Sequence, residues 1–288
     1  MREIVVISGK GGTGKTSLTG AFAHLAENKI ICDLDVDAPD LHIILSPDMA
    51  CTEDFYSGHE AVIDNSRCQM CGTCLDMCQF GAVKFDGTRY FIENLRCEGC
   101  KVCVSFCPGE AIDFPARYCG QWFVSSTRFG TMVHARLFPG AENSGRLVTL
   151  LRNQAREKAR QEGKDLILCD GAPGIGCPVI SSLSGTNLAV IVTEPTLSGL
   201  HDLQRVAQLC SHFKTRVAVV INKFDLNIQQ SREIEDYCRG KNFELAGNMP
   251  YDPHFTAAMV DKMVVTESSD SRVARKVSRI WEQILKLL

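Results

Sequence analysis

The glycine-rich segment after the first apolar run constrains the fold of this chain more than any other feature. Residues Gly9-Lys10-Gly11-Gly12-Thr13-Gly14-Lys15-Thr16 fit the phosphate-loop pattern G-x-x-x-x-G-K-[ST]. The run Ile4-Val5-Val6-Ile7 before it has the composition of a buried strand, and residues 15–27 after it have a helical pattern. A phosphate loop needs a strand before it and a helix after it. The sequence therefore predicts a phosphate-binding unit of strand, loop and helix.

The same alternation of strand and helix patterns continues along most of the chain. Apolar runs of strand length recur at 29–32, 166–169, 188–192 and 217–221, and helical patterns lie at 145–162 and 201–213. Such alternation predicts an α/β fold, in which helices cover both faces of a mostly parallel sheet. With the phosphate loop, this is the sheet of a P-loop NTPase.

A second feature interrupts the alternation between residues 60 and 115. Two cysteine runs there share the spacing C-x2-C-x2-C-x3-C, and a shift of 29 residues, from Cys68 to Cys97, maps one run onto the other. The match includes neighbours such as Arg67 with Arg96, so the segment is an internal duplication. The first run is Cys68, Cys71, Cys74 and Cys78, and the second is Cys97, Cys100, Cys103 and Cys107.

These runs resemble those of bacterial-type two-cluster ferredoxins, in which the fourth cysteine of each run binds the other cluster. The resemblance implies a small α+β domain with two [4Fe-4S] clusters; structural zinc is the alternative. Cys107 is followed by Pro108 as the pattern requires, but Cys78 is followed by Gln79, whose N–H can alter the potential of a cluster bound by Cys78. The implied ligands are Cys68, Cys71, Cys74 and Cys107 for the first cluster, and Cys97, Cys100, Cys103 and Cys78 for the second.

The position of the duplication predicts how the chain is divided. We expect residues 1–59 and 116–288 to form one P-loop domain, with residues 60–115 inserted as a ferredoxin-like 2[4Fe-4S] domain. Residues 118–145 are rich in Gly, Ser and Thr and carry no clear pattern. They are expected only to lead the chain back into the host domain.

The chemistry of a phosphate loop assigns roles to several residues. Backbone N–H groups of the loop face the phosphates, Lys15 reaches the β- and γ-phosphates, and the Thr16 hydroxyl binds Mg²⁺. The predicted nucleotide-binding residues are Gly9, Lys10, Gly11, Gly12, Thr13, Gly14, Lys15, Thr16, Ser17 and Asn222.

The loop has an additional lysine, Lys10, and in this it resembles the deviant loop of the MinD/ParA/nitrogenase-iron-protein group of P-loop ATPases. The resemblance implies that Lys10 crosses a dimer interface to the partner's nucleotide, that Asp35 of Asp33-Leu34-Asp35 orients the attacking water, and that Asp170 helps to hold Mg²⁺ through water. Lys10, Lys15, Asp35 and Asp170 are then the catalytic residues. The alternatives are a solvated loop lysine and ordinary carboxylates at strand ends.

With the cysteine segment between these two aspartates, the whole chain is similar to MinD-superfamily ATPases that contain an inserted ferredoxin domain. The base is less constrained. Lys10 indicates ATP, whereas Asn222-Lys223-Phe224-Asp225 fits the N-K-x-D pattern that selects guanine in GTPases. ATP is favoured because Lys10 defines the family, and Asn222 is expected to contact the base in either case.

Cys177 lies seven residues after Asp170, where the nitrogenase iron protein places one ligand of a cluster shared by two subunits. The other ligand would fall near Asn143-Ser144, where there is no cysteine. A third, bridging cluster is therefore not predicted.

Composition limits the partners and the compartment. The net charge of -3 and the lack of a basic stretch with interleaved aromatic residues argue against a nucleic-acid partner. Eight of the 15 cysteines have cluster spacing and the chain starts with a strand pattern rather than a signal sequence, which predicts a cytoplasmic protein. No apolar stretch approaches the roughly 20 residues of a membrane span. The amphipathic C-terminal segment 272–288 is expected to dock on the sheet rather than to anchor the chain.

These features predict a nucleotide-dependent iron–sulfur ATPase that forms a homodimer or pairs with a similar ATPase. Mg²⁺-dependent ATP hydrolysis would be coupled either to electron transfer or to cluster assembly on a redox protein or metalloprotein client. Two other classes stay open, a nucleotide-binding redox module without hydrolysis and a protein that positions cell structures. The intact Lys10 and Asp35 disfavour the first class, and the cysteine insert disfavours the second.

Overall fold

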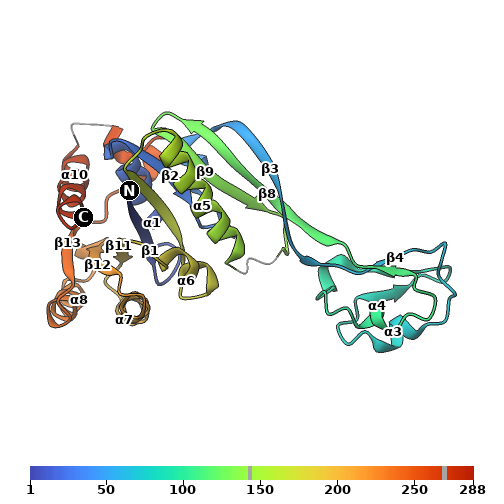
Figure 1. Ribbon diagram of the computed structural model, residues 1–288. Coiled ribbons are helices and arrows are strands. Elements are labelled where there is room, and N and C mark those ends of the chain that lie inside the picture. The colour runs from blue at the N-terminus through green and yellow to red at the C-terminus, as the bar shows by residue number, and fades with distance from the viewer. Residues whose placement is uncertain (142–144, 268–270) are drawn as a thin grey trace. The chain divides into compact units, whose positions relative to one another are not determined.

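The computed structural model describes residues 1–141, 145–267 and 271–288, which form two compact units (Figure 1). The described parts of residues 1–53, 121–137 and 143–288 are here called the host unit. The described parts of residues 54–120 and 138–142 are called the cysteine unit. The insert expected at 60–115 lies within the cysteine unit.

The host unit is built on one large sheet, which has nine strands among the described residues. Each neighbouring pair from β13 to β9 is parallel, which confirms the predicted α/β fold with a mostly parallel sheet. In order across the sheet the strands are β13 (Glu244–Asn248), β12 (Arg216–Ile221), β11 (Leu188–Thr193), β1 (Arg2–Ser8), β10 (Leu166–Pro173), β2 (Lys29–Asp33), β9 (Gly130–Leu137), β8 (Ala116–Thr127) and β3 (Asp48–His59).

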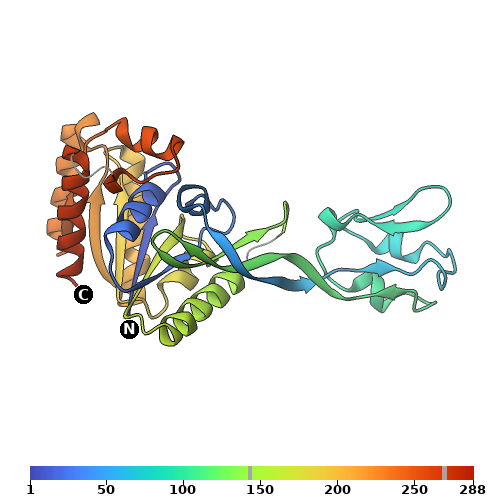
Figure 2. The ribbon, with the colours of Figure 1, turned by 90° about the horizontal axis from the view of Figure 1, so that it is seen from above.

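Helices cover both faces of this sheet (Figure 2). One face carries α1 (Lys15–Leu25), α2 (Leu41–Leu45) and α10 (Arg272–Leu285), which share an apolar cluster with the strands. The other face is contacted by α5 (Arg146–Gln161), α6 (Cys177–Leu183), α7 (Leu197–His212) and α8 (Ile228–Gly240). Shorter helical turns are η2 (Phe224–Leu226), α9 (His254–Val260) and η3 (Val265–Glu267).

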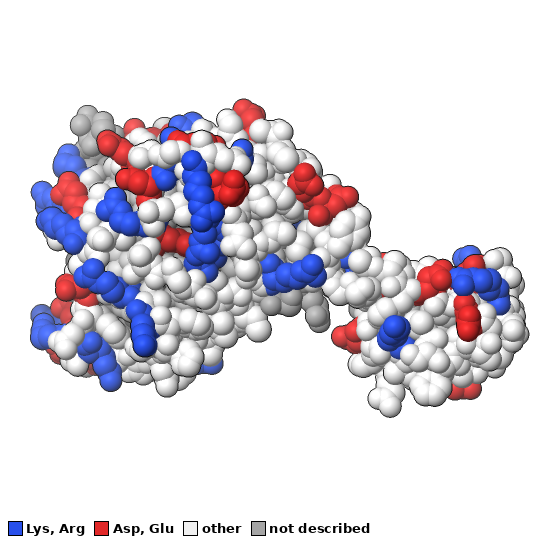
Figure 3. Space-filling model, in the orientation of Figure 1, with Lys and Arg blue, Asp and Glu red and all other residues white. Residues whose placement is uncertain are grey.

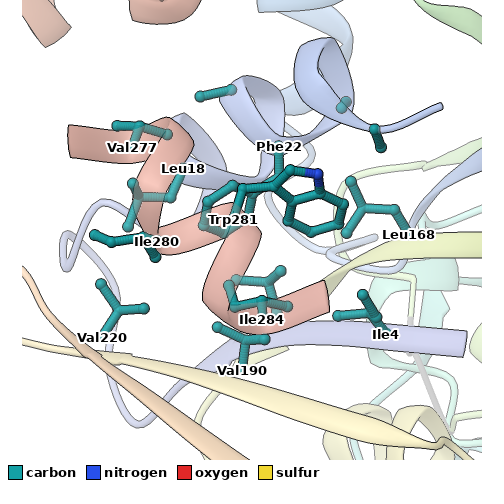
Figure 4. Close-up of a cluster of buried hydrophobic side chains, with 14 of the residues drawn as sticks. Ile4, Leu18, Phe22, Leu168, Val190, Val220, Val277, Ile280, Trp281 and Ile284 are labelled. Carbon is teal, nitrogen blue, oxygen red and sulfur yellow. The ribbon is translucent and has the colours of Figure 1, made fainter. Parts of the chain in front are cut away.

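The central strands are apolar throughout because both of their faces are covered. In β1, Ile4 and Val6 belong to the cluster with α1 and α10, while Val5, which alternates with them, is equally buried. Trp281 of α10 stacks on Phe22 of α1, with ring centroids 5.2 Å apart (Figure 4). The apolar side of the C-terminal helix thus docks on the sheet, as its sequence predicts.

The segment that carried no clear sequence pattern, 118–145, contains most of β8 and all of β9. Buried polar side chains of these strands form hydrogen bonds with one another, as Ser125 and His134 do at 2.8 Å. At the turn between the strands, Arg128 donates to the Ile44 carbonyl and pairs with Glu267. Buried polar pairs of this kind obscure the alternation on which a strand prediction depends.

The cysteine unit has two short antiparallel sheets, β4 (Val62–Ile63) with β7 (Ile112–Asp113) and β5 (Val83–Phe85) with β6 (Tyr90–Ile92). The internal duplication is visible in the pairing, because Ile63 pairs with Ile112 and Val83 pairs with Ile92, positions that the 29-residue shift exchanges. Its helical turns are α3 (Thr73–Met77), η1 (Asn94–Arg96) and α4 (Val102–Ser105).

On the face shown in Figure 3, basic and acidic side chains intermingle over the host unit. Among the described residues, no helix combines the length and the apolar character needed to span a membrane.

Candidate functional site

The phosphate-loop segment runs from the end of β1 to the start of α1. Gly14 precedes α1 with a left-handed backbone (φ 87°), and a Cβ at this position would lie 2.4 Å from the Asn222 side-chain nitrogen. Only glycine fits there. Asn222 donates to the Thr13 carbonyl at 2.8 Å, and the Lys223 ammonium donates to the Gly12 carbonyl at 3.1 Å. Two consecutive residues after β12 therefore hold the loop in place.

Four of the predicted site residues meet at the carboxyl ends of β2 and β10. The Lys15 ammonium lies 3.0 Å from Asp170 Oδ2 and 3.3 Å from Asp35 Oδ2. The Thr16 hydroxyl donates to Asp170 Oδ2 at 2.9 Å, and Thr19, one turn later in α1, donates to Asp170 Oδ1 at 2.7 Å. The loop lysine and the helix hydroxyls thus converge on the carboxylate that ends the neighbouring strand.

The charges in this pocket are unbalanced. Burial opposes ionisation of Lys15, but the carboxylates of Asp170, Asp35 and Asp33 outweigh it and raise the pKa of Lys15 above its usual value. Burial also raises the pKa of Asp35, and the nearby Asp170 adds to this effect. Three carboxylates face one ammonium, an excess of negative charge that a divalent cation would neutralise.

Asp33 is a residue whose importance the sequence analysis missed. It is fully buried, its Oδ1 accepts from the Asp35 N–H at 3.1 Å, and its Oδ2 has no hydrogen-bond partner among the described residues. Burial, followed by the charge of Asp170, raises its pKa well above the usual range. Its signal was its position, because Asp33 is the cross-strand partner of Asp170. An unpaired buried oxygen beside these groups fits a donor such as water bound to Mg²⁺.

Lys10 is held by residues that follow β11. Its ammonium pairs with Glu194 Oε1 at 2.5 Å and lies 3.2 Å from Ser198 Oγ. Lys223 pairs with the other Glu194 oxygen at 3.3 Å. Burial opposes ionisation of Glu194, but Lys10 and Lys223 outweigh it and lower the pKa of Glu194. Sequence reasoning did not identify this glutamate as the partner of Lys10.

The remaining nucleotide candidates make contacts within the chain. Ser17 Oγ lies 3.2 Å from Met259 Sδ of α9. The Asn222 oxygen accepts from the Lys223 N–H at 3.0 Å, so both polar groups of this buried side chain have protein partners. Asp225 is exposed, and its Oδ1 accepts from the Tyr251 N–H at 2.7 Å. Of the N-K-x-D segment, Asp225 is therefore the polar side chain that faces solvent.

The eight cysteines of the two runs line two pockets in the cysteine unit. In each pocket three cysteines come from one run and the fourth comes from the other, which is the division that the resemblance to two-cluster ferredoxins implies. One pocket is lined by Cys68, Cys71, Cys74 and Cys107, and the other is lined by Cys78, Cys97, Cys100 and Cys103.

The backbone around the two pockets is alike. Helices α3 and α4 each begin after a left-handed residue, Gly72 (φ 80°) and Lys101 (φ 65°). The fourth cysteine of each run accepts a hydrogen bond from a backbone N–H four residues later, at 3.3 Å in both cases. These bonds run from Ala82 to Cys78 and from Ala111 to Cys107. N–H groups directed at sulfur favour its thiolate form.

Thiols of one run lie close enough to influence one another. Burial raises the pKa of Cys74, and raises that of Cys103 to about 11; neighbouring cysteines add to both shifts. Within the described ranges, no group of three or more His, Cys, Asp and Glu side chains is arranged to hold a metal ion. Cys177 is exposed at the start of α6, and Asn143 and Ser144, near which a second ligand of a bridging cluster would fall, lie outside the described residues.

The chain matches a known protein family. The family model of the CobQ/CobB/MinD/ParA nucleotide binding domain matches residues 4–265. The uncharacterized protein MJ0578 of Methanocaldococcus jannaschii is 31% identical over 290 residues, which span 99% of this chain and 97% of that protein.

Solved structures show the same fold. The chain is similar to the cell division ATPase MinD of Pyrococcus furiosus, with a TM-score of 0.58 and 17% identity over 100% of this chain and 99% of that one. It is also similar to MinD of Pyrococcus horikoshii OT3 complexed with Mg-ADP, with a TM-score of 0.57 and 16% identity over 99% of this chain and 96% of that one. The chain therefore belongs to the CobQ/CobB/MinD/ParA family of nucleotide-binding proteins and has the fold of the MinD and ParA ATPases.

Proposed function

We propose that the chain is an iron–sulfur ATPase, in which ATP binding at the phosphate loop controls the use of two [4Fe-4S] clusters in the cysteine pockets. The observation that carries the proposal is the division of eight cysteines into two pockets of four, each drawn from both runs, in a chain of this nucleotide-binding family. A nucleotide site and an electron carrier in one polypeptide suggest that the two are coupled.

On the nucleotide side, the loop from Gly9 to Ser17 would cradle the phosphates, with Lys15 at the β- and γ-phosphates. Thr16 would bind Mg²⁺, and Asp170 would hold it through water; the excess of carboxylates and the unpaired Asp33 oxygen support a cation there. Because Asp35 lies 3.3 Å from the Lys15 ammonium, it would stand beside the phosphates that Lys15 contacts. We assign it the orientation of the attacking water.

Lys10 is proposed to act on the nucleotide bound by a second chain. Its side chain is 32% exposed and its ion pair with Glu194 lies near the surface, so exchange of this pair for a contact with a partner would disturb no buried network. A lysine charge supplied across an interface stabilises the transferring phosphoryl group only when the two chains close. Closure of the dimer would then be the event that couples nucleotide to the clusters.

On the cysteine side, bound [4Fe-4S] clusters would supply one-electron transfer. The chain would provide four thiolates for each cluster and the Ala82 and Ala111 N–H groups that are directed at sulfur. Zinc is the alternative, but structural zinc usually takes its ligands from two separate C-x2-C pairs, whereas each run here has three closely spaced cysteines and a fourth after them. The client would be a redox protein or a metalloprotein that receives a cluster, because both uses need the same residues.

The cluster assignment is tested by metal analysis after anaerobic purification. We expect about eight irons per chain, with sulfur-to-iron charge-transfer absorption. Cys78→Ala should damage the cluster bound by Cys97, Cys100 and Cys103, while Cys177→Ala, outside both pockets, should leave the iron content unchanged. Stoichiometric zinc without visible absorption would overturn the assignment, and loss of the cluster at Cys68, Cys71 and Cys74 in Cys78→Ala would overturn the crossed ligation.

The dimer assignment is tested by mixing two inactive variants. Lys10→Ala should bind nucleotide and hydrolyse it more slowly, by about 10³-fold if it behaves like an arginine finger supplied in trans. Asp35→Ala should be inactive as well, but a mixed dimer keeps one site with both Asp35 and a partner's Lys10. Activity should therefore partly return on mixing, and Lys241→Ala, an exposed lysine after α8, should be silent. A silent Lys10→Ala with no recovery would instead support a redox module that only binds nucleotide.

Guanine nucleotide is the second candidate substrate, and the exposure of Asp225 favours it. With Asn222 and Lys223 bound to the loop, Asp225 is free to accept hydrogen bonds on Oδ2, and guanine presents two donors on the edge where adenine presents an acceptor. Hydrolysis of ATP and GTP by the protein and by Asp225→Asn decides between them. A preference for GTP that Asp225→Asn abolishes would replace ATP with GTP in the proposal.

A further inference from the structure

The two cysteine pockets differ at Thr73, whose hydroxyl contacts a sulfur atom. We infer that Thr73 donates a hydrogen bond to the Cys71 sulfur and raises the reduction potential of the cluster bound by Cys68, Cys71, Cys74 and Cys107, a contact that the other cluster lacks. The inference rests on the proposed function, since it requires that the pockets hold iron–sulfur clusters.

The contact is local and comes from the first residue of a helix. Thr73 begins α3, and its Oγ1 lies 3.4 Å from Cys71 Sγ. The 29-residue shift of the duplication carries Cys71 onto Cys100 and Thr73 onto Val102, which begins α4. Threonine and valine are both branched at Cβ and have nearly the same shape. The two repeats therefore differ here by a hydroxyl group on an equivalent scaffold.

One backbone contact of the fourth cysteine is matched between the pockets, whereas the residues that follow Cys78 and Cys107, Gln79 and Pro108, differ and are unchanged by a substitution at Thr73. The N–H of Ala82 donates to Cys78 and the N–H of Ala111 donates to Cys107, both at 3.3 Å. The residues before α3 and α4 share the left-handed conformation, so the backbones approach Cys71 and Cys100 in the same way. Thr73 also lines its pocket together with the four cysteines.

The direction of the effect follows from the charge on sulfur. A cysteine bound to iron has lost its proton, so in this pair the Thr73 hydroxyl must donate. A hydrogen bond to a ligand sulfur stabilises the more negative, reduced state of a cluster more than the oxidised state, and so it raises the reduction potential. Val102 has no hydrogen to donate to Cys100.

A second difference between the repeats acts on the other cluster. Lys101 stands where the first repeat has Gly72, and its ammonium lies over the Phe114 ring, 5.7 Å from the centroid. Lys101 is exposed, so water and salt screen its charge, whereas the Thr73 hydroxyl contacts a ligand sulfur directly. A substitution at Thr73 leaves the Lys101 charge in place.

The test uses the duplication as its own control. Thr73→Val (T73V) gives the first repeat the residue of the second, Val102→Thr (V102T) does the reverse, and Thr73→Ser (T73S) keeps the hydroxyl. The proteins are loaded with clusters anaerobically, and each cluster is titrated potentiometrically, with visible absorption and electron paramagnetic resonance as readouts. Iron and sulfide content is measured on the same samples.

T73V should shift one of two reduction waves to more negative potential. We expect the ratio of reduced to oxidised cluster at a fixed potential to fall at least about threefold, which is ~28 mV at ~59 mV per tenfold change for one electron. T73S should keep the native potential, and V102T should shift the other wave to more positive potential.

The outcomes separate this inference from the proposed function. A native protein that binds no iron would overturn the proposed function itself. Full cluster content with an unchanged wave in T73V, or a shift of the same wave in T73V and V102T, would overturn the inference alone. If T73V loses its cluster, V102T decides by itself, because Thr73 is intact there and an unchanged second wave would overturn the inference.

Discussion

The host unit and the cysteine unit solve the problem of stability differently. The host unit buries a large apolar cluster between its sheet and helices α1, α2 and α10. Hydrophobic burial of that extent stabilises a domain without further help, whereas a unit at or below about 70–80 residues is often stabilised by disulfides or metals. The cysteine unit has no disulfide among its described residues, because all of its cysteines are free thiols. Few apolar residues of the cysteine unit are buried in the described segment 54–120: Phe55, Ala61, Ala82, Val83, Ala111, Ile112 and Cys119.

The cysteine unit leaves several of its large apolar residues exposed. Leu95 is 74% exposed and Phe106 is 58% exposed, whereas Phe22 of the host unit is completely buried. The difference teaches that large apolar side chains form a core in one unit and remain largely at the surface in the other. In the cysteine unit the inward positions are occupied by sulfur, and the cofactor proposed there would take the place of a core.

Removal of the iron–sulfur clusters proposed for the cysteine unit should have the largest effect, and its absence would contradict the comparison of the two units. We expect backbone amides of the cysteine unit to lose hydrogen-exchange protection by several orders of magnitude, because the binding energy of a structural metal, about 10–16 kcal/mol in zinc-finger peptides, is folding energy. Amides of β1 in the host unit should keep their protection. Mass spectrometry of exchange in cluster-loaded and chelator-treated protein makes the measurement. Unchanged protection in the cysteine unit would show that its residues fold it without a cofactor.

Loss of an aromatic residue from the apolar cluster should destabilise the host unit and leave the cysteine unit unchanged. Trp281→Ala removes the ring that stacks on Phe22 in the apolar cluster, so it should lower the free energy of unfolding of the host unit by about 3–5 kcal/mol. Urea unfolding measures this, and iron content should stay the same. Leu285→Ala, on the exposed side of the same helix, is the control and should cost less than about 0.5 kcal/mol. Equal effects of the two substitutions would contradict the docking of α10.

A buried histidine should make the host unit sensitive to acid. Burial, and then the charges of His42 and Arg136, lower the pKa of His134 from 6.5 to about 4. The unfolded chain therefore takes up a proton near pH 6.5 that the folded chain does not bind until about pH 4. Stability is present above pH 6.5 and is lost as the pH falls toward 4, by about 2 kcal/mol between pH 7.5 and 5.

His134→Gln, which retains a polar group for Ser125 but cannot be protonated, tests this origin of the acid sensitivity. Urea unfolding of the native protein and the variant at pH 7.5 and 5 should show that the variant loses less stability across this interval. The same loss in both proteins would assign the sensitivity to other groups.

Helix caps should give the smallest effect and sharpen the comparison. Asn227 caps α8 by accepting from the Gln230 N–H at 3.0 Å, so Asn227→Ala should lower the free energy of unfolding by about 1 kcal/mol in urea titrations. Asn227→Asp should restore most of it. In the cysteine unit, α3 and α4 have no side-chain cap and follow Gly72 and Lys101. If Asn227→Ala has unchanged stability, helix caps contribute as little to the host unit as to the cysteine unit, whose helices α3 and α4 have no side-chain cap.

The parts of the fold that the sequence predicted are those in which one local pattern decides the structure. Strands β1, β10 and β11 were predictable because strands covered on both faces are continuous apolar runs. Strand β9 was not, because buried His134 is paired with Ser125, a partner that becomes apparent only when β8 lies beside it. Strand β3 was missed as well, since most of its residues are exposed and it lacks an apolar alternation.

The residues of the candidate site likewise fall into those that a local motif or the family resemblance predicts and those that it does not. Lys15 and Thr16 follow from the loop motif, and Asp35 and Asp170 from the family likeness. The roles of Asp33 and Glu194 depend on groups that are distant in sequence, Asp170 across the sheet and Lys10 across the loop. The cysteine spacing predicted clusters, but the contact of Thr73 with sulfur is a matter of side-chain geometry that spacing does not contain.

The strands that lead into the cysteine unit have a consequence for protein engineering. β3 and β8 are neighbours in the sheet, and each continues from the host unit into the cysteine unit, where the rings of Tyr56 and Tyr118 lie 5.3 Å apart and the Cys119 thiol donates to the Ser57 carbonyl at 3.3 Å. The chain therefore leaves and returns through a ladder that already holds its ends together. The entropic cost of closing a loop grows only slowly with loop length, so this pair of strands can accept inserted domains of very different length. We expect that the cysteine unit can be replaced by a foreign domain whose termini lie about 5 Å apart, which is one strand spacing.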